Sequence, residues 1–160
     1  IEADDTGSTL HDKLASIGAS LLLEVLVQIQ NKSLSPQVQD SSLACYAEKL
    51  QKAEARIDWN DDVSLVERNI RAFNAWPVAH SWYQGKMLRI WEASADVDVK
   101  IGSDVSPGEI ISADSSGILV ACGQSALMLT RVQLAGKKQV SAREFINNRV
   151  LIGEHLVEEH

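Results

Sequence analysis

The spacing of apolar residues along the chain changes at one stretch, IRAFNAWP, residues 70–77. Upstream of this stretch, apolar residues recur at the i, i+3, i+7 and i+10 positions of an amphipathic helix: Val63, Val66, Ile70 and Phe73. Asp61 and Asp62 are suitable N-caps for that helix and complement its dipole. Pro77 prevents its continuation. The sequence therefore predicts a helix that begins at about residue 61 and ends near Asn74.

Downstream of Pro77 the apolar pattern shortens to that of strands. Residues 80–93 predict a hairpin with Gly85 in its turn, and residues 108–113, 117–122 and 126–134 predict three further strands. Short strands with turns about every ten residues indicate a small closed or half-open barrel. Ser141 and Glu144 have the spacing of a capping box, which predicts a last helix to about Asn148.

The first 60 residues have a different organisation. Apolar residues at helical spacing predict a helix over residues 8–29, and a segment rich in Ser, Gln and Lys follows as a linker over residues 31–60. Within it, residues 50–59 are expected to form an exposed connector. The expected division is a helical segment 1–30, a linker 31–60, a barrel domain 61–153 and a tail 154–160, native or added. The predicted fold class is α+β.

Net charge is −7, which argues against a strong nucleic-acid binder as a whole. The charge is unevenly distributed, with −5 in residues 1–75, +1 in residues 76–153 and −3 in residues 154–160. A local basic face on the middle of the chain therefore stays open, because local potential steers a polyanion better than net charge does.

Several classes of function find no support in the sequence. No apolar run has the length of a membrane span, and the acidic start does not resemble a signal peptide. The two cysteines, Cys45 and Cys122, lack metal-site spacing and are expected to be free thiols. No histidine pair has metal-ligand spacing, and no glycine-rich phosphate loop is present. The first residue, Ile1, fits a fragment or a processed chain.

Three groups of side chains are candidates for binding. The tryptophans Trp59, Trp76, Trp82 and Trp91 suit either a packed core, which is the commoner role, or the stacking of nucleobases. Arg68 and Arg71 share one side of a helix, where they are either solvated or in contact with phosphates. The pair Lys137-Lys138 follows a glycine, and a flexible loop there would present both ammonium groups to a polyanion.

The chain also resembles the C-terminal part of the methionyl-tRNA formyltransferases, over about residues 4–150. Six motifs in the family's order carry this resemblance, while Ala75 departs from it because the family usually has proline there. The matching stretches are residues 5–14, Cys45-Tyr46-Ala47-Glu48-Lys49-Leu50, residues 52–59, residues 70–77, Pro107-Gly108-Glu109-Ile110 with Gly117-Ile118 and Cys122-Gly123, and Gly136-Lys137-Lys138 with Ser141-Ala142 and Phe145.

The resemblance implies a role in formyl transfer from 10-formyltetrahydrofolate to the amino group of methionyl initiator tRNA. In this family the catalytic residues and the folate pocket lie in an N-terminal Rossmann-like domain, of which residues 1–30 resemble the last helix. No residue here matches them, so the chain is expected to carry no catalytic residue, no metal and no cofactor, and to be inactive alone. The implied partners are the initiator tRNA and the catalytic domain, in the cytoplasm and without a membrane.

The resemblance also implies that an OB-like barrel, with the linker, helps to position the tRNA. Basic residues on the predicted helices, strands and loops are then candidates for tRNA contact: Arg68, Arg71, Lys86, Arg89, Arg131, Lys137, Lys138, Arg143 and Arg149. Two alternatives remain: a structural brace without nucleic-acid contact, and the C-terminal domain of a sugar-nucleotide formyltransferase. Clustering of the basic residues would distinguish tRNA positioning from a purely structural brace. The linker signature favours tRNA over a sugar nucleotide as the substrate.

Overall fold

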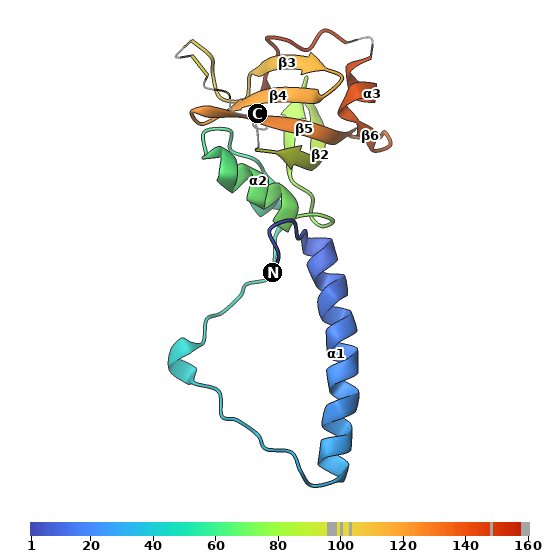
Figure 1. Ribbon diagram of the computed structural model, residues 1–160. Coiled ribbons are helices and arrows are strands. Elements are labelled where there is room, and N and C mark those ends of the chain that lie inside the picture. Colours follow the sequence, from blue (N-terminus) through green and yellow to red (C-terminus); the bar gives the residue numbers. More distant parts are fainter. Residues whose placement is uncertain (96–98, 100, 103, 148, 158–160) are drawn as a thin grey trace.

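The computed structural model describes residues 1–95, 99, 101–102, 104–147 and 149–157. It confirms the α+β class, with a curled antiparallel sheet and few helices (Figure 1). The predicted Asn148 helix end and residues 158–160 of the expected tail lie outside these ranges. The helices are α1 (Gly7–Gln30), α2 (Val63–Ala72) and α3 (Ala142–Ile146), with 3-10 turns at Ser41–Leu43 and Lys52–Ala55. The strands are β1 (His80–Tyr83), β2 (Lys86–Ser94), β3 (Ile110–Asp114), β4 (Gly117–Cys122), β5 (Ser125–Leu134), β6 (Val140–Ser141) and β7 (Leu156–Val157).

The strands follow the order β3-β4-β5-β2-β1-β7, and β6 pairs with β5. All these pairs are antiparallel, and the predicted hairpin is confirmed because β1 and β2 join through Gln84-Gly85 with His80 opposite Arg89. The register of β2 against β5 shifts between Ile90 and Ala93. Such irregularities bend a strand and help a sheet to curl.

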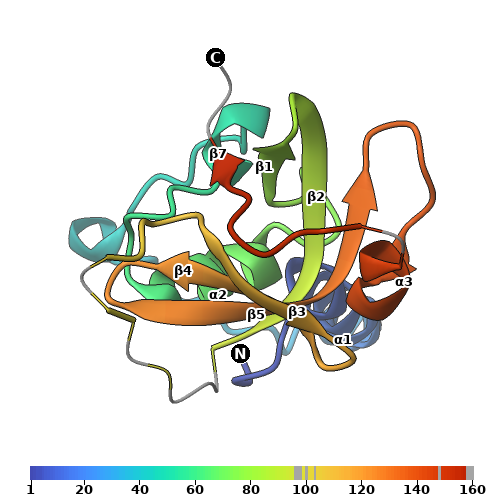
Figure 2. The ribbon, with the colours of Figure 1, turned by 90° about the horizontal axis from the view of Figure 1, so that it is seen from above.

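The C-terminal segment completes the wall of the barrel. β7 pairs with β1 on one side (Figure 2). On the other side, the Leu156 N–H donates to Gly108 O over 2.8 Å and the Ile110 N–H donates to Glu154 O over 2.8 Å. Residues 154–157, which the sequence assigned to a tail outside the barrel, thus connect β1 to the start of β3.

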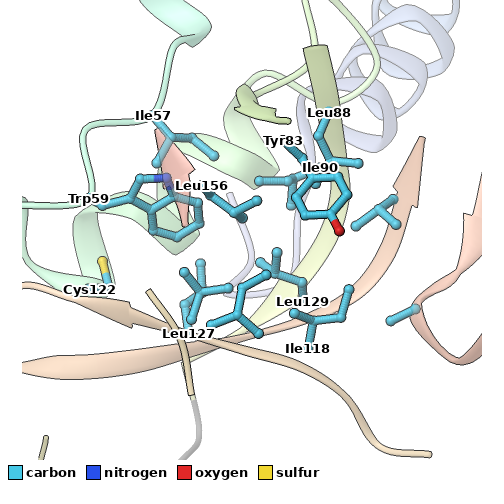
Figure 3. Packing of buried hydrophobic residues seen from close by; sticks show 14 of the residues in the cluster. Ile57, Trp59, Tyr83, Leu88, Ile90, Ile118, Cys122, Leu127, Leu129 and Leu156 are labelled. Carbon is cyan, nitrogen blue, oxygen red and sulfur yellow. The ribbon is translucent and has the colours of Figure 1, made fainter. Parts of the chain in front are cut away.

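The core lies inside this curled sheet and receives residues from the linker (Figure 3). Ala55, Ile57 and Trp59 are buried while Arg56 and Asp58 between them are exposed. The Ile57 N–H donates to His80 O over 2.9 Å, and Trp59 Nε1 donates to Ser81 Oγ over 3.1 Å. The expectation of an exposed connector is therefore wrong for Ala55, Ile57 and Trp59, because these alternating apolar side chains turn towards the barrel.

The predicted first helix is confirmed, although no residue of α1 is buried. It extends away from the barrel (Figure 1) and leaves a series of apolar side chains exposed, among them Leu14, Ile17, Leu21, Leu22, Leu23, Leu26 and Ile29. A capping box between Thr6 and Thr9 fixes its start. Among the described residues, no helix has both the length and the apolar character to cross a membrane.

The start of α1 is attached to the end of α2. The Ser8 N–H donates to Asn74 O over 2.7 Å, and an Arg71 guanidinium nitrogen donates to Asp5 O over 2.9 Å. A Cβ on Gly7 would lie 2.4 Å from Ala72 O, so only glycine allows this approach. Helix α2 in turn buries Val66 and Ile70 in the barrel core, which ties α1 to the barrel.

Candidate nucleic-acid interface

A groove of about 730 Å³ runs over the outer face of β1 and β2. Its walls are the turn after α2, the linker near its 3-10 turn, and one residue of β5. Apart from the neutral amide of Gln133, the described residues that line it are aromatic, basic or apolar, and none of them is acidic: Lys52, Ala53, Arg56, Ala75, Trp76, Pro77, Val78, His80, Trp82, Met87, Arg89, Trp91 and Gln133.

Strand alternation explains how these side chains reach one face. In β2, Leu88 and Ile90 point into the core, so Met87, Arg89 and Trp91 point outward. Arg89 lies opposite His80 of β1 and Gln133 of β5. The groove is therefore a direct result of the register of three neighbouring strands.

The four tryptophans fall into two groups. Trp59 belongs to the core, as the commoner role predicts, whereas the other three line the groove. Trp82 is only 9% exposed and contacts the His80 ring edge-on, with the ring centroids 5.2 Å apart. Trp76 is 53% exposed and offers much of its ring to solvent at the groove.

The loop that carries Lys137 and Lys138 is held beside this groove. Gln133 accepts a hydrogen bond from Trp91 Nε1 over 3.1 Å and donates its own Nε2 to Lys137 O over 2.9 Å. The Ala135 N–H donates to Met87 O over 2.8 Å, which brings the loop next to the start of β2. Both lysine side chains are exposed.

Of the predicted basic residues, Arg89 lines the groove, and Gln133 links the groove wall to the loop that carries Lys137 and Lys138. Those two lysines line a separate cavity that also contains Glu144, and Lys86 lies at the start of β2. Sequence reasoning missed Lys52 and Arg56, which also line the groove. The signal for Arg56 was present in the alternation of Ala55, Ile57 and Trp59, which places Arg56 on the opposite side from the core.

The other candidates lie elsewhere or have internal partners. Arg71 Nε lies 2.6 Å from Glu67 Oε1, and this bond raises the pKa of Arg71 above its usual value. Arg131 Nε lies 3.1 Å from Glu92 Oε1 on the surface. Arg68 is exposed on α2 and Arg143 is exposed on α3. Arg149 lies over the Phe145 ring, 4.3 Å from its centroid, and helps to line a second cavity of about 270 Å³ that includes Lys137 and Lys138.

Within the described ranges, no three His, Cys, Asp or Glu side chains lie close enough together to hold a metal ion. Both cysteines are free, and burial, with help from the carboxylates of Asp61, Asp62 and Asp58, raises the pKa of Cys122 to about 12. A thiol with that pKa is a poor nucleophile at neutral pH. The basic and aromatic side chains that line the groove are instead suited to binding an anionic ligand with an aromatic ring.

The sequence matches the protein family described as "Formyl transferase, C-terminal domain" over residues 49–150. The methionyl-tRNA formyltransferase of Hahella chejuensis is 45% identical over 147 residues, which cover 92% of this chain and 45% of the relative. That of Pseudomonas putida (strain GB-1) is 46% identical over 149 residues, which cover 93% of this chain and 46% of the relative. The chain spans about half the length of the curated relatives it matches.

Solved structures share the fold at lower identity. A variant of HypX from Aquifex aeolicus superposes with a TM-score of 0.69 at 17% identity, covering 92% of this chain and 27% of the HypX chain. HypX in complex with tetrahydrofolic acid superposes with a TM-score of 0.60 at 20% identity, covering 87% of this chain and 23% of that chain. At these identities the likeness concerns the fold alone.

Proposed function

The chain belongs to the formyl transferase C-terminal domain family, and we propose that it is the tRNA-positioning part of a methionyl-tRNA formyltransferase. In this proposal the complete enzyme transfers a formyl group from 10-formyltetrahydrofolate to the amino group of methionyl initiator tRNA in the cytoplasm. The folate and the catalytic residues belong to the remainder of that enzyme. The chain by itself is therefore expected to give no formyl-methionyl-tRNA when mixed with both substrates.

One observation carries the tRNA role. Lys52, Arg56 and Arg89 line the groove, and no described residue that lines it is acidic. Gln133 links this groove to the Lys137-Lys138 loop, whose two lysines line a separate cavity together with Arg149 and Glu144. Contacts from Lys and Arg to phosphates supply most of the non-specific affinity for nucleic acid. This local surface accounts for binding by a chain whose net charge is −7.

The proposed contribution to catalysis is orientation. Interactions with remote parts of a substrate restrict its motion and hold the reacting group where the chemistry occurs. A barrel that grips the tRNA body would place the acceptor end, with its methionyl amine, at the catalytic domain. The residues proposed for this grip are Lys86, Arg89, Lys137 and Lys138, with Arg68, Arg131, Arg143 and Arg149 as outlying contacts and Arg71 mainly engaged within the protein.

The exposed apolar side chains of α1 support a second, structural role. Such a series of exposed apolar side chains on one helix usually marks a contact with another protein or domain. We assign this contact to the catalytic domain, because residues 5–14 resemble its last helix. The bracing role and tRNA binding are compatible, and the names of the quoted relatives favour tRNA over a sugar nucleotide as the substrate.

Titration of initiator tRNA into the chain at about 50 and about 200 mM salt tests the proposal. Four phosphate contacts predict saturable binding that weakens roughly 50- to 150-fold between the two conditions. Dextran sulfate similar in size to tRNA, titrated in its place, controls for attraction to any polyanion. Absence of tRNA binding at the lower salt concentration would leave only the bracing role.

A further inference from the structure

The groove combines features that go beyond a general attraction to phosphates. We propose that it binds one unpaired nucleotide of RNA, with the base stacked on Trp76 and the phosphates directed to Arg89 and Lys52. This inference rests on the proposed function, since it names the part of an RNA that the surface receives. It concerns an unstacked nucleotide, which a regular duplex does not offer.

The exposure of Trp76 is the first step. Tryptophan normally buries most of its ring, and Trp82 and Trp91 in the same groove follow that rule to different extents. Trp82 is packed edge-on against His80, and the indole nitrogen of Trp91 is bound by Gln133. Trp76 is 53% exposed beside them, so its ring is the one available to a ligand.

Rigid support makes this ring a suitable platform. Pro77 follows Trp76 directly, and Asn74, two residues before Trp76, is held by two hydrogen bonds. The Asn74 carbonyl accepts the Ser8 N–H over 2.7 Å, and its Nδ2 donates to Trp91 O over 3.0 Å. These bonds hold the chain just before Trp76 in place, so less backbone entropy is lost when a base stacks on its ring.

The size and charge of the groove select the kind of ligand. A volume of about 730 Å³ lies within the range of about 300–1,000 Å³ that is typical of small-molecule sites. The described lining includes Lys52, Arg56 and Arg89 and no carboxylate, which fits an anion. Aromatic and cationic side chains together are the usual means by which proteins hold unpaired nucleotides.

The polar side chains of the groove predict weak base preference. Gln133 already uses its amide oxygen for Trp91 and its amide nitrogen for Lys137 O. His80 Nδ1 lies 3.2 Å from Val78 O. With these groups engaged, recognition depends on stacking and charge, which every base satisfies.

Binding of a six-nucleotide uridine RNA to the chain, followed by anisotropy of a dye on the RNA, tests the inference. Trp76→Ala is expected to weaken this binding at least about five-fold, because stacking is lost. Trp76→Phe keeps an aromatic face and should recover most of the affinity, which separates stacking from a merely structural role. Tyr46→Ala is the matched control, since Tyr46 is an 84% exposed aromatic of the linker outside the groove.

A duplex RNA of 12 base pairs and initiator tRNA are titrated in parallel. Weaker hexamer binding by Trp76→Ala, with duplex binding unaffected, is the expected result. Equal hexamer affinity of Trp76→Ala and the unmodified chain would overturn the inference, and a protein segment would then be the better occupant. Binding of tRNA without any binding of the hexamer would also overturn it while leaving the proposed function intact, whereas failure of tRNA itself to bind would reject the proposed function.

Discussion

Trp91 and Gln133 connect the groove to the basic loop, because Trp91 Nε1 donates a hydrogen bond to Gln133 Oε1 over 3.1 Å. Gln133 then donates its Nε2 to the carbonyl of Lys137 over 2.9 Å. One side chain thus orders both the wall of the groove and the position of Lys137 and Lys138. The two parts of the proposed tRNA surface are expected to act together.

Replacement of Gln133 should therefore weaken tRNA binding although Gln133 is not among the residues proposed to contact phosphates. Gln133→Ala removes both hydrogen bonds and leaves the loop less ordered. The expected cost is about 1 kcal/mol of binding free energy, which is about a five-fold loss of tRNA affinity. Fluorescence titration with labelled initiator tRNA measures it. Gln139→Ala, in the same exposed loop, is the control; equal affinities for the two variants would show that Gln133 does not order the surface.

The barrel should depend on its C-terminal strand. Leu156 is 2% exposed within the core, and Leu156→Ala is expected to lower the free energy of unfolding by about 2–4 kcal/mol. Ile152→Ala, at a residue 63% exposed in the same segment, should change it by less than about 0.5 kcal/mol. Urea denaturation compares the two. A similar small effect for both would mean that residues 154–157 do not close the barrel in solution.

The attachment of α1 should be sensitive to a single methyl group. Gly7→Ala places a Cβ 2.4 Å from Ala72 O and 2.7 Å from Asn74 O, so the start of α1 must shift, at a cost of about 1–3 kcal/mol. Gly18→Ala meets no atom within 4 Å and should stabilise α1 by about 1 kcal/mol. Hydrogen exchange of the Ser8 amide is expected to accelerate in Gly7→Ala alone. Unchanged protection of Ser8 would contradict the attachment described here.

Acid should weaken the same junction through Asp5. A hydrogen bond from Lys13 Nζ over 2.7 Å, with others from the Glu2 N–H and Thr9 Oγ1, lowers the pKa of Asp5 from 3.8 to about 2. Because the folded-state pKa is the lower one, the stabilisation is complete above about pH 4 and is lost as the pH falls towards 2. The ¹³C shift of the Asp5 carboxyl should titrate near pH 2 in the unmodified chain and at a higher pH in Lys13→Gln, where the bonds from Glu2 and Thr9 remain. A midpoint near 4 in the unmodified chain would refute the contact.

Local patterns in the sequence were sufficient for most of the secondary structure. The caps at Asp62 and Ser141, the helical spacing of Val66 and Ile70, and the glycine turn of the hairpin each depend on neighbours within a few residues. The barrel closure was not accessible in this way. It requires Gly108 to pair with Leu156 and Arg56 with His80, and such distant pairings leave no local periodicity.

The candidate site was predictable only in part, for the same reason. The sequence identified Lys86, Arg89 and the Lys137-Lys138 pair as separate basic residues. Strand register places Arg89 opposite Gln133, whose amide then binds the Lys137 carbonyl. It did not distinguish Trp76 from the core residue Trp59, because exposure depends on packing between α2, the linker and β2. The ion pair of Arg71 with Glu67 shows the converse, a basic residue whose charge serves the fold.

The central claim is that the surface around the Lys137-Lys138 loop binds tRNA, and its most direct test is the salt dependence of binding in a charge-reversed variant. Lys137→Glu combined with Lys138→Glu should weaken initiator tRNA binding and reduce the slope of log affinity against log salt by about 1.5–2, as expected for two lost phosphate contacts. Gln28→Glu, Gln30→Glu and Lys32→Glu together make the same change in net charge at the far end of α1 and should leave the slope unchanged. Equal slopes in all three proteins would contradict the claim and assign the loop to another role.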